Sequence, residues 1–149
     1  SVRSMNKEGG DITEEFRKDL DISYRNTSFM KNDRIITSAF FKLEPGNPEE
    51  ITAKMEELMG KRKNSQPLEF PSAGSTFKRP EGYFAGKLIE DCGLKGLTVG
   101  GAQVSTKHAG FIVNIGGATC EDVKRLIEQI KSTVLQQTGV ALECEIKFL

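Results

Sequence analysis

The stretch "TCEDVKRLIEQIKSTVLQQTGVALECEIKF", residues 119 to 148, decides the fold class of this chain of 149 residues. Its first part predicts an amphipathic helix, with Thr119 at the N-terminal cap and Gly139 just past the end. Its second part, residues 140 to 148, alternates apolar and polar side chains and predicts a strand with one buried face. That face carries Val140, Leu142, Cys144, Ile146 and Phe148. Because helices and strands mix without a regular βαβ repeat, we expect an α+β domain.

Two further elements are predicted upstream. "RIITSAFFKL", residues 34 to 43, is β-branched and aromatic, which is typical of a strand. Asn47 can cap a helix that has Pro48 at its first position and ends near "KRKNSQP", residues 61 to 67. The apolar face of this helix consists of Ile51, Met55, Leu58 and Met59. Residues 1 to 33 are polar and turn-rich, and too poor in apolar side chains to fold alone.

The middle of the chain predicts shorter elements. "GYFAGKLIEDCG", residues 82 to 93, indicates a short helix closed by Gly93. "GLTVGGAQVST", residues 96 to 106, and "GFIVNIGGA", residues 110 to 118, indicate short strands separated by glycine bends. Together with the helix and strand near the end of the chain, these elements suffice for one globular domain.

Composition excludes some classes of partner. Lys and Arg together number 21, as do Asp and Glu, so the formal net charge is zero and no global field attracts nucleic acid or an acidic membrane. The three cysteines, Cys92, Cys120 and Cys144, lack C-x-x-C spacing, which favours reduced thiols in the cytoplasm. No apolar run reaches membrane-spanning length, and "SVRSMNKEGGD" reads as the middle of a protein.

The loop "PSAGSTFKRPEG", residues 71 to 82, is both bent and basic. Ser75 follows Gly74, where a glycine lets the backbone turn sharply and approach a ligand. A nucleophilic serine would need a base, and His108, the one histidine, has no orienting acid at a recognisable spacing. Ser75 is therefore predicted either to donate a proton or to satisfy the backbone of the turn. Lys78 and Arg79 can hold an anion such as phosphate, or remain solvated.

Three more positions carry weaker signals. Arg25 lies beside Tyr24 and among hydroxyl side chains, which suits either a carboxylate clamp or a surface position. Glu145 lies near the end of the last predicted strand and points either into a cleft or into solvent. His108 is a ligand contact or a turn residue, and a lone histidine predicts no metal site.

Long motifs add a family resemblance. Residues 66 to 96, 99 to 119 and 142 to 148, together with "ISYRNTSFMK" at 22 to 31, resemble the carboxy-terminal half of the UDP-N-acetylenolpyruvoylglucosamine reductase family. The resemblance extends from about Asp21 onward. These flavoenzymes complete UDP-N-acetylmuramic acid for peptidoglycan. The family's amino-terminal flavin-binding segment, with its Gly-Gly-Gly-Ser-Asn type of motif, is not among these residues.

The resemblance implies a reaction and a set of residues. Reduced FAD, regenerated by NADPH, delivers hydride from N5 to the methylene carbon of an enolpyruvyl group, and charge builds on the adjacent carbon. In the matching positions, Ser75 donates the proton, while Arg25 and Glu145 stabilise the enolate-like charge. The residues expected to bind the UDP-sugar substrate are Tyr24, Lys78, Arg79 and His108. Arg79 stands where the family often has Asn, and Asn26-Thr27 stand where Asp-Ser is common.

The resemblance also implies an organisation. Residues 1 to 46 correspond to the end of the FAD-binding region and a connecting strand, and residues 47 to 149 to the substrate-binding domain. The chain would then need the missing amino-terminal FAD-binding half and would by itself be inactive and hold little FAD. The expected role is that of a cytoplasmic oxidoreductase in cell wall biogenesis, cell shape and cell division, without nucleic acid, membrane or metal. The alternative is a stand-alone nucleotide-sugar-binding module without redox activity.

Overall fold

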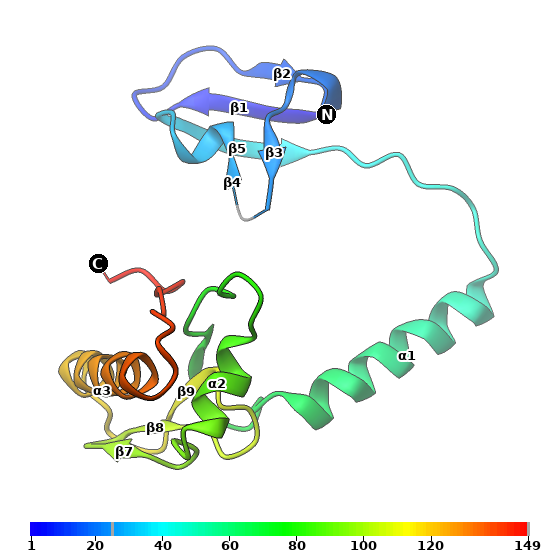
Figure 1. Cartoon of the computed structure of the whole chain (residues 1–149). Coiled ribbons are helices and arrows are strands. Elements are labelled where there is room, and N and C mark those ends of the chain that lie inside the picture. The colour runs from blue at the N-terminus through cyan, green and yellow to red at the C-terminus, as the bar shows by residue number, and fades with distance from the viewer. Residues whose placement is uncertain (25, 149) are drawn as a thin grey trace. The chain divides into compact units, whose positions relative to one another are not determined.

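The computed structural model describes residues 1–24 and 26–148 (Figure 1). The chain divides between Asn47 and Pro48 into two compact units. The first unit is mostly short strands, and the second contains all three α-helices and a separate sheet. Mixed helix and sheet confirm the predicted α+β class.

The first unit is built on a three-stranded antiparallel sheet in the order β2-β1-β5. Its strands are β1 (Val2–Asn6), β2 (Thr13–Glu15) and β5 (Arg34–Ala39). Two very short strands, β3 (Ile22–Ser23) and β4 (Asn26–Thr27), pair with each other, and two 3-10 turns, η1 (Arg17–Asp19) and η2 (Ser28–Met30), complete the unit.

The first unit agrees with its polar, turn-rich sequence except in the length of one strand. Residues 1 to 33 form short strands and turns, and β1 is held by cross-strand bonds more than by apolar burial. The guanidinium of Arg34 donates from Nε to the buried Ser4 hydroxyl at 2.8 Å and from Nη2 to the Ser4 carbonyl at 2.8 Å. The predicted strand at 34 to 43 is shorter than expected and ends at Ala39, although Phe40 still donates its N–H to the Ser1 carbonyl.

The second unit begins with α1 (Pro48–Ser65), which confirms the predicted helix and its proline start. No residue of α1 is buried. The four apolar side chains of its predicted face are all exposed by about half or more. Helix α1 is therefore set by local signals and not by packing against the rest of its unit.

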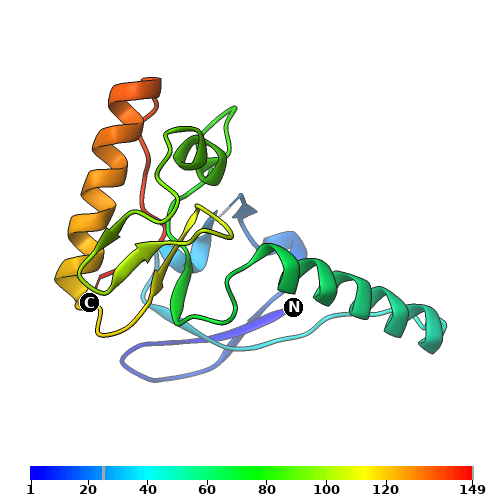
Figure 2. The same ribbon diagram turned by 90° about the horizontal axis from the view of Figure 1, so that it is seen from below.

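The core of the second unit lies between helices and a four-stranded antiparallel sheet in the order β6-β9-β8-β7. The strands are β6 (Ser72–Ser75), β7 (Thr98–Val99), β8 (Ala102–Val104) and β9 (Phe111–Asn114). The helices are α2 (Ala85–Asp91) and α3 (Cys120–Thr138), and Figure 2 shows α3 beside the sheet. Four α3 residues are fully buried in this core: Leu126, Ile127, Ile130 and Val134.

The ends of α3 confirm the signals read from the sequence. The Thr119 hydroxyl accepts the N–H of Asp122 at 3.1 Å, and the Asp122 carboxylate accepts the N–H of Thr119 at 2.9 Å, which forms a capping box. At the other end Gly139 adopts the left-handed conformation, with φ of 73°. Local chemistry therefore fixes both limits of the helix.

The prediction of a regular strand at 140 to 148 was wrong. The segment is extended but makes one isolated bridge, between Cys144 and Phe77. Burial alternates as expected around Leu142, which is buried, yet Phe148 is 44% exposed. The ladder stays short because its partner segment soon reaches Pro80, which has no N–H to donate.

Candidate functional site

Three backbone segments of the second unit lie side by side around residues 75 to 78. On one side, Thr76 donates its N–H to the Gly110 carbonyl at 2.8 Å. On the other side, Glu145 donates its N–H to the Thr76 carbonyl at 2.9 Å, and Lys78 donates to the Glu143 carbonyl at 2.8 Å. The loop read from the sequence as bent and basic is thus the middle strand of this small arrangement.

Ser75 lies at the end of β6, opposite Phe111 of β9, and is exposed. Gly74 before it has φ of 90°, a conformation that favours glycine, and so turns the chain immediately before the serine. The Ser75 hydroxyl donates to the Phe77 carbonyl at 3.4 Å, a long bond that leaves the hydroxyl oxygen open. A short hydroxyl at the end of a strand is a suitable donor for a substrate atom placed there.

Glu145 is half-buried, and its backbone is hydrogen-bonded to the Thr76 carbonyl of the loop. The hydrogen bond from its N–H fixes its backbone next to the residue that follows Ser75. The structure therefore brings together two of the predicted catalytic residues, which are 70 positions apart in sequence.

The two cations of the loop are already engaged. Lys78 forms an ion pair with Glu143, and both side chains are exposed. The Arg79 guanidinium donates to the Tyr83 carbonyl at 3.3 Å and lies 3.9 Å above the centre of the Phe84 ring. Lys78 thus remains beside the site, whereas Arg79 is directed along the loop toward α2.

His108 lies in the turn before β9, on the Gly110 side of the loop. Its Nδ1 accepts the N–H of Gly110 at 3.1 Å, and its ring makes an edge-to-face contact with Phe111 at 5.0 Å between centroids. The Ser105 hydroxyl accepts the N–H groups of Lys107 and His108, which shapes the turn. Ser75, Lys78, His108 and Glu145 therefore belong to one arrangement within the second unit.

The remaining predicted residues lie elsewhere. Tyr24 belongs to the first unit, where its side chain is 73% exposed. Arg25, the third predicted catalytic residue, lies outside the described residues. Among the described residues, no group of three or more His, Cys, Asp or Glu side chains is arranged to hold a metal ion. No helix in the described part of the chain is long and apolar enough to cross a membrane.

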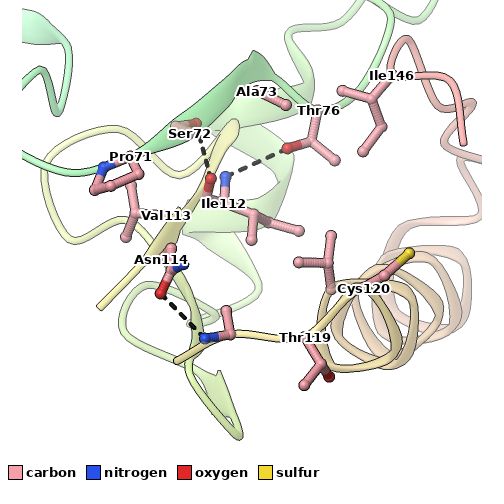
Figure 3. Close-up of a pocket in the computed structure, with 12 residues that line it drawn as sticks. Pro71, Ser72, Ala73, Thr76, Ile112, Val113, Asn114, Thr119, Cys120 and Ile146 are labelled. Atoms are coloured by element: carbon pink, nitrogen blue, oxygen red, sulfur yellow. Dashed lines mark hydrogen bonds between the residues drawn. The ribbon is translucent and has the colours of Figure 1, made fainter. Parts of the chain in front are cut away.

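A cavity of about 440 Å³ lies between the sheet and the first turn of α3 (Figure 3). Its polar groups already have partners: the Ser72 hydroxyl donates to the Ile112 carbonyl at 2.8 Å, and Thr76 accepts the Ile112 N–H at 3.3 Å. Asn114 accepts the N–H of Ala118 at 3.2 Å. Ser75, His108 and Glu145 do not line this cavity, so it is separate from the candidate site.

The cysteines do not add chemistry to the site. Burial raises the pKa of the Cys144 thiol, which lies next to Glu145, and burial likewise raises the pKa of Cys92. A raised pKa leaves less thiolate, the reactive form. The interpretation of Cys144 as a packing residue is supported by its contact with the core.

Sequence reasoning missed Thr76, Gly86 and Gly110. Thr76 is buried and joins all three segments through its backbone and side chain. Gly86 and Gly110 both lie close to the Cε1–Nδ1 edge of the His108 ring. Neither glycine has a left-handed φ, so no local turn signal marks it.

Comparison with known proteins identifies the family of the chain. The family model described as UDP-N-acetylenolpyruvoylglucosamine reductase, C-terminal domain, matches residues 66–149. Proteins named UDP-N-acetylenolpyruvoylglucosamine reductase are 51% identical over 149 residues in Lachnoclostridium phytofermentans and 50% identical over 140 residues in Clostridium novyi. These alignments cover 100% and 94% of this chain, and 48% and 46% of the two relatives.

A solved structure supports the same family. The crystal structure of UDP-N-acetylenolpyruvylglucosamine reductase from Thermus caldophilus matches with a TM-score of 0.79 and 34% identity, over 98% of this chain and 51% of that one. The chain thus spans about half the length of the relatives it matches. The resemblance read from the motifs is confirmed: this chain belongs to the UDP-N-acetylenolpyruvoylglucosamine reductase family and corresponds to its carboxy-terminal part.

Proposed function

We propose that this chain supplies the substrate-binding and proton-donating part of a reductase that converts UDP-N-acetylglucosamine enolpyruvate to UDP-N-acetylmuramate in peptidoglycan synthesis. The intact protein would be a cytoplasmic oxidoreductase that uses FAD and NADPH. The observation that supports this most directly is the hydrogen-bonded order of three segments, which gathers Ser75, Glu145 and His108 around one loop.

In the proposed reaction, an enolpyruvyl carbon–carbon double bond gains a hydride at the methylene carbon and a proton at the adjacent carbon. The residues of this chain account for the proton and for the charge that precedes it. The open hydroxyl of Ser75 donates the proton. Arg25 and Glu145 stabilise the negative charge that develops on the adjacent carbon and its carboxylate, with Glu145 protonated or sharing a proton.

The UDP part of the substrate needs groups that favour an anionic diphosphate. Lys78 and His108 flank the Ser75 loop and are proposed to serve this purpose, with Tyr24 as a further substrate contact. Arg79 was predicted to join them, but its bonds to Tyr83 and Phe84 direct it along the loop. A role for Arg79 would require it to exchange these contacts for the ligand.

The glycine pair of the first unit does not have the form of a dinucleotide-binding turn. The Gly9–Gly10 pair has positive φ values and open space around it, but it belongs to the connection between β1 and β2 and does not lead into an α-helix, as a dinucleotide-binding turn would. The cavity nearby is lined by Asn6, Lys7, Glu8 and Asp33, and Lys7 is already paired with Asp33. We therefore propose that FAD binding depends on the amino-terminal half of the longer relatives.

The proposal is tested with Ser75→Ala in the intact reductase. Reduction of the flavin by NADPH should be unchanged, because it involves no substrate carbon. Reoxidation by the enolpyruvyl substrate should slow by about 10²–10⁴-fold, the usual value of a positioned acid. Ser75→Cys should keep part of the rate, since a thiol also donates a proton. Ser132→Ala, which removes an exposed hydroxyl from α3, is the matched control.

Two results would contradict the proposal. If Ser75→Ala weakens substrate binding while the saturated rate of reoxidation survives, the loop is a cradle and another group supplies the proton. If the intact protein binds UDP-sugars but shows no flavin spectrum, it is the alternative, a nucleotide-sugar-binding module without redox activity.

A further inference from the structure

The Cε1–Nδ1 edge of the His108 imidazole lies against two glycines. A Cβ atom built on Gly86, in α2, would lie 3.1 Å from Cε1 of His108, and one built on Gly110 would also lie 3.1 Å from Cε1. Neither residue has a left-handed φ. A side chain at either position would therefore have to displace the ring slightly, so glycine is favoured there by the closeness of the ring and not by backbone conformation.

A hydrogen bond between Gly110 and the His108 ring determines which ring nitrogen carries the proton. Nδ1 accepts the N–H of Gly110 at 3.1 Å, so Nδ1 must present a lone pair. In a neutral imidazole the proton is then on Nε2. The edge-to-face contact with Phe111 holds the ring in the same orientation.

Nε2 is not fully buried. Within the described part of the chain, the only buried side-chain nitrogen or oxygen without a hydrogen-bond partner is the hydroxyl of Ser28, and no hydrogen bond of the described residues uses Nε2. The turn that holds the ring is itself fixed to the catalytic loop, because the Gly110 carbonyl accepts the N–H of Thr76. The Nε2–H thus belongs to a turn that is hydrogen-bonded to the loop next to Ser75.

We propose that Gly86 and Gly110 are positioning residues that hold His108 as the Nε2–H tautomer and make Nε2–H an uncharged donor for an anionic ligand. The ligand class, the diphosphate of a UDP-sugar, rests on the proposed function above. The tautomer and the roles of the two glycines do not, so the two can be tested separately.

The first experiment uses nuclear magnetic resonance on the 15N-labelled chain without ligand. His108 is the one histidine of the sequence, so its ring signals need no assignment by mutation. At a pH where the imidazole is neutral, we expect the proton on Nε2 and a scalar coupling across the hydrogen bond between the Gly110 nitrogen and Nδ1. A ring that carries its proton on Nδ1, or a missing coupling, would overturn the assignment.

The second experiment introduces Gly86→Ala, which places a methyl group against Cε1. We expect the coupling to disappear and the ring to exchange between both neutral tautomers. Gly60→Ala is the matched control, because Gly60 is also helical and has nothing within 4 Å of a built Cβ. Gly110→Ala provides a second, independent displacement of the ring. If Gly86→Ala and Gly110→Ala folded normally and both kept the coupling and a single tautomer, the positioning role of the two glycines would be refuted.

The third experiment adds UDP as the probe. The Nε2–H signal should shift on titration, and His108→Ala should weaken binding by about ten- to a hundredfold, the value of a hydrogen bond to a charged group. His108→Gln should recover part of the affinity, because its side-chain amide also donates. If UDP shifts other signals but not that of His108, the donor role is wrong and the proposed function stands. If UDP shifts none, ligand binding by this unit is contradicted, while the tautomer result still decides the role of the glycines.

Discussion

The backbone N–H of Glu145 donates to the Thr76 carbonyl at 2.9 Å, and this bond places the backbone of a predicted catalytic residue beside the residue that follows Ser75. Thr76 also binds the opposite segment, through the Gly110 carbonyl. Thr76, which is buried, thereby connects both sides of the candidate site.

Glu145→Gln in the intact reductase should slow substrate-dependent reoxidation by about 10²–10³-fold, a typical loss for one group that stabilises developing charge. The rate of flavin reduction by NADPH should stay the same. Stopped-flow absorbance measures both half-reactions. Glu56→Gln, on the exposed surface of α1, should change neither. An unchanged reoxidation rate in Glu145→Gln would remove Glu145 from the proposed chemistry.

Thr76→Val should lower the free energy of unfolding by about 1–3 kcal/mol, because the buried N–H of Ile112 loses the hydroxyl that accepts it at 3.3 Å. Chemical denaturation followed by circular dichroism gives the value. Thr106→Val makes the same chemical change at an exposed position and should stay within about 0.5 kcal/mol. Equal effects of the two substitutions would show that the Thr76 hydroxyl bond is not stabilising.

Asp122 should make the stability of α3 depend on pH. The pKa of its carboxyl is held below the ordinary value of 3.8, first by the Thr119 backbone N–H and then by the Thr119 side chain. A lowered pKa in the folded state means that the carboxylate contributes stability above the unfolded pKa, and loses it as the pH falls through the folded value. The stability difference between the parent protein and Asp122→Asn should therefore shrink below about pH 4. A difference that is constant down to pH 2 would contradict this.

Gly101→Ala should destabilise the second unit by about 1–3 kcal/mol or more, since a Cβ there would overlap the Gly116 carbonyl and the backbone of Ala118. Backbone atoms cannot swing away as a flexible side chain can. Gly60→Ala in α1 meets nothing and should instead stabilise its helix by up to about 1 kcal/mol. Thermal unfolding measures both variants. If the prediction holds, the melting temperature falls in Gly101→Ala, whereas the stability of the helical signal rises in Gly60→Ala.

The helices could be predicted from the sequence because their limits are local. Pro48, Gly93, Thr119 and Gly139 all act within one helical turn of the residues they terminate. Strand β1 could not be predicted, because its stability depends on Arg34, about 30 positions away. The length of the strand expected at 140 to 148 was overestimated for a related reason. The alternation of apolar and polar residues predicted the burial of Leu142, but it could not show that the segment pairing with this strand is short.

The candidate site likewise contains residues that could be predicted from the sequence and residues that could not. Ser75 and Glu145 stand out from their local sequence, and their roles follow from long motifs that resemble a family. The structure brings the two residues together without testing these roles. Gly86 and Gly110 could not be found, because a glycine without a positive φ looks unremarkable until its neighbour is known. His108 is that neighbour, and it lies 22 positions from Gly86 in sequence.

The extended segment at 143 to 145 has a consequence for motion. It is joined to the loop by one bridge, a pair of backbone bonds and the Lys78–Glu143 ion pair, and Cys144 packs against the core, whereas α3 is anchored by four fully buried side chains. We therefore expect local opening to cost less for this segment than for α3. The predicted acid of the site is thus carried by a segment that depends on fewer fully buried side chains than the helix behind it.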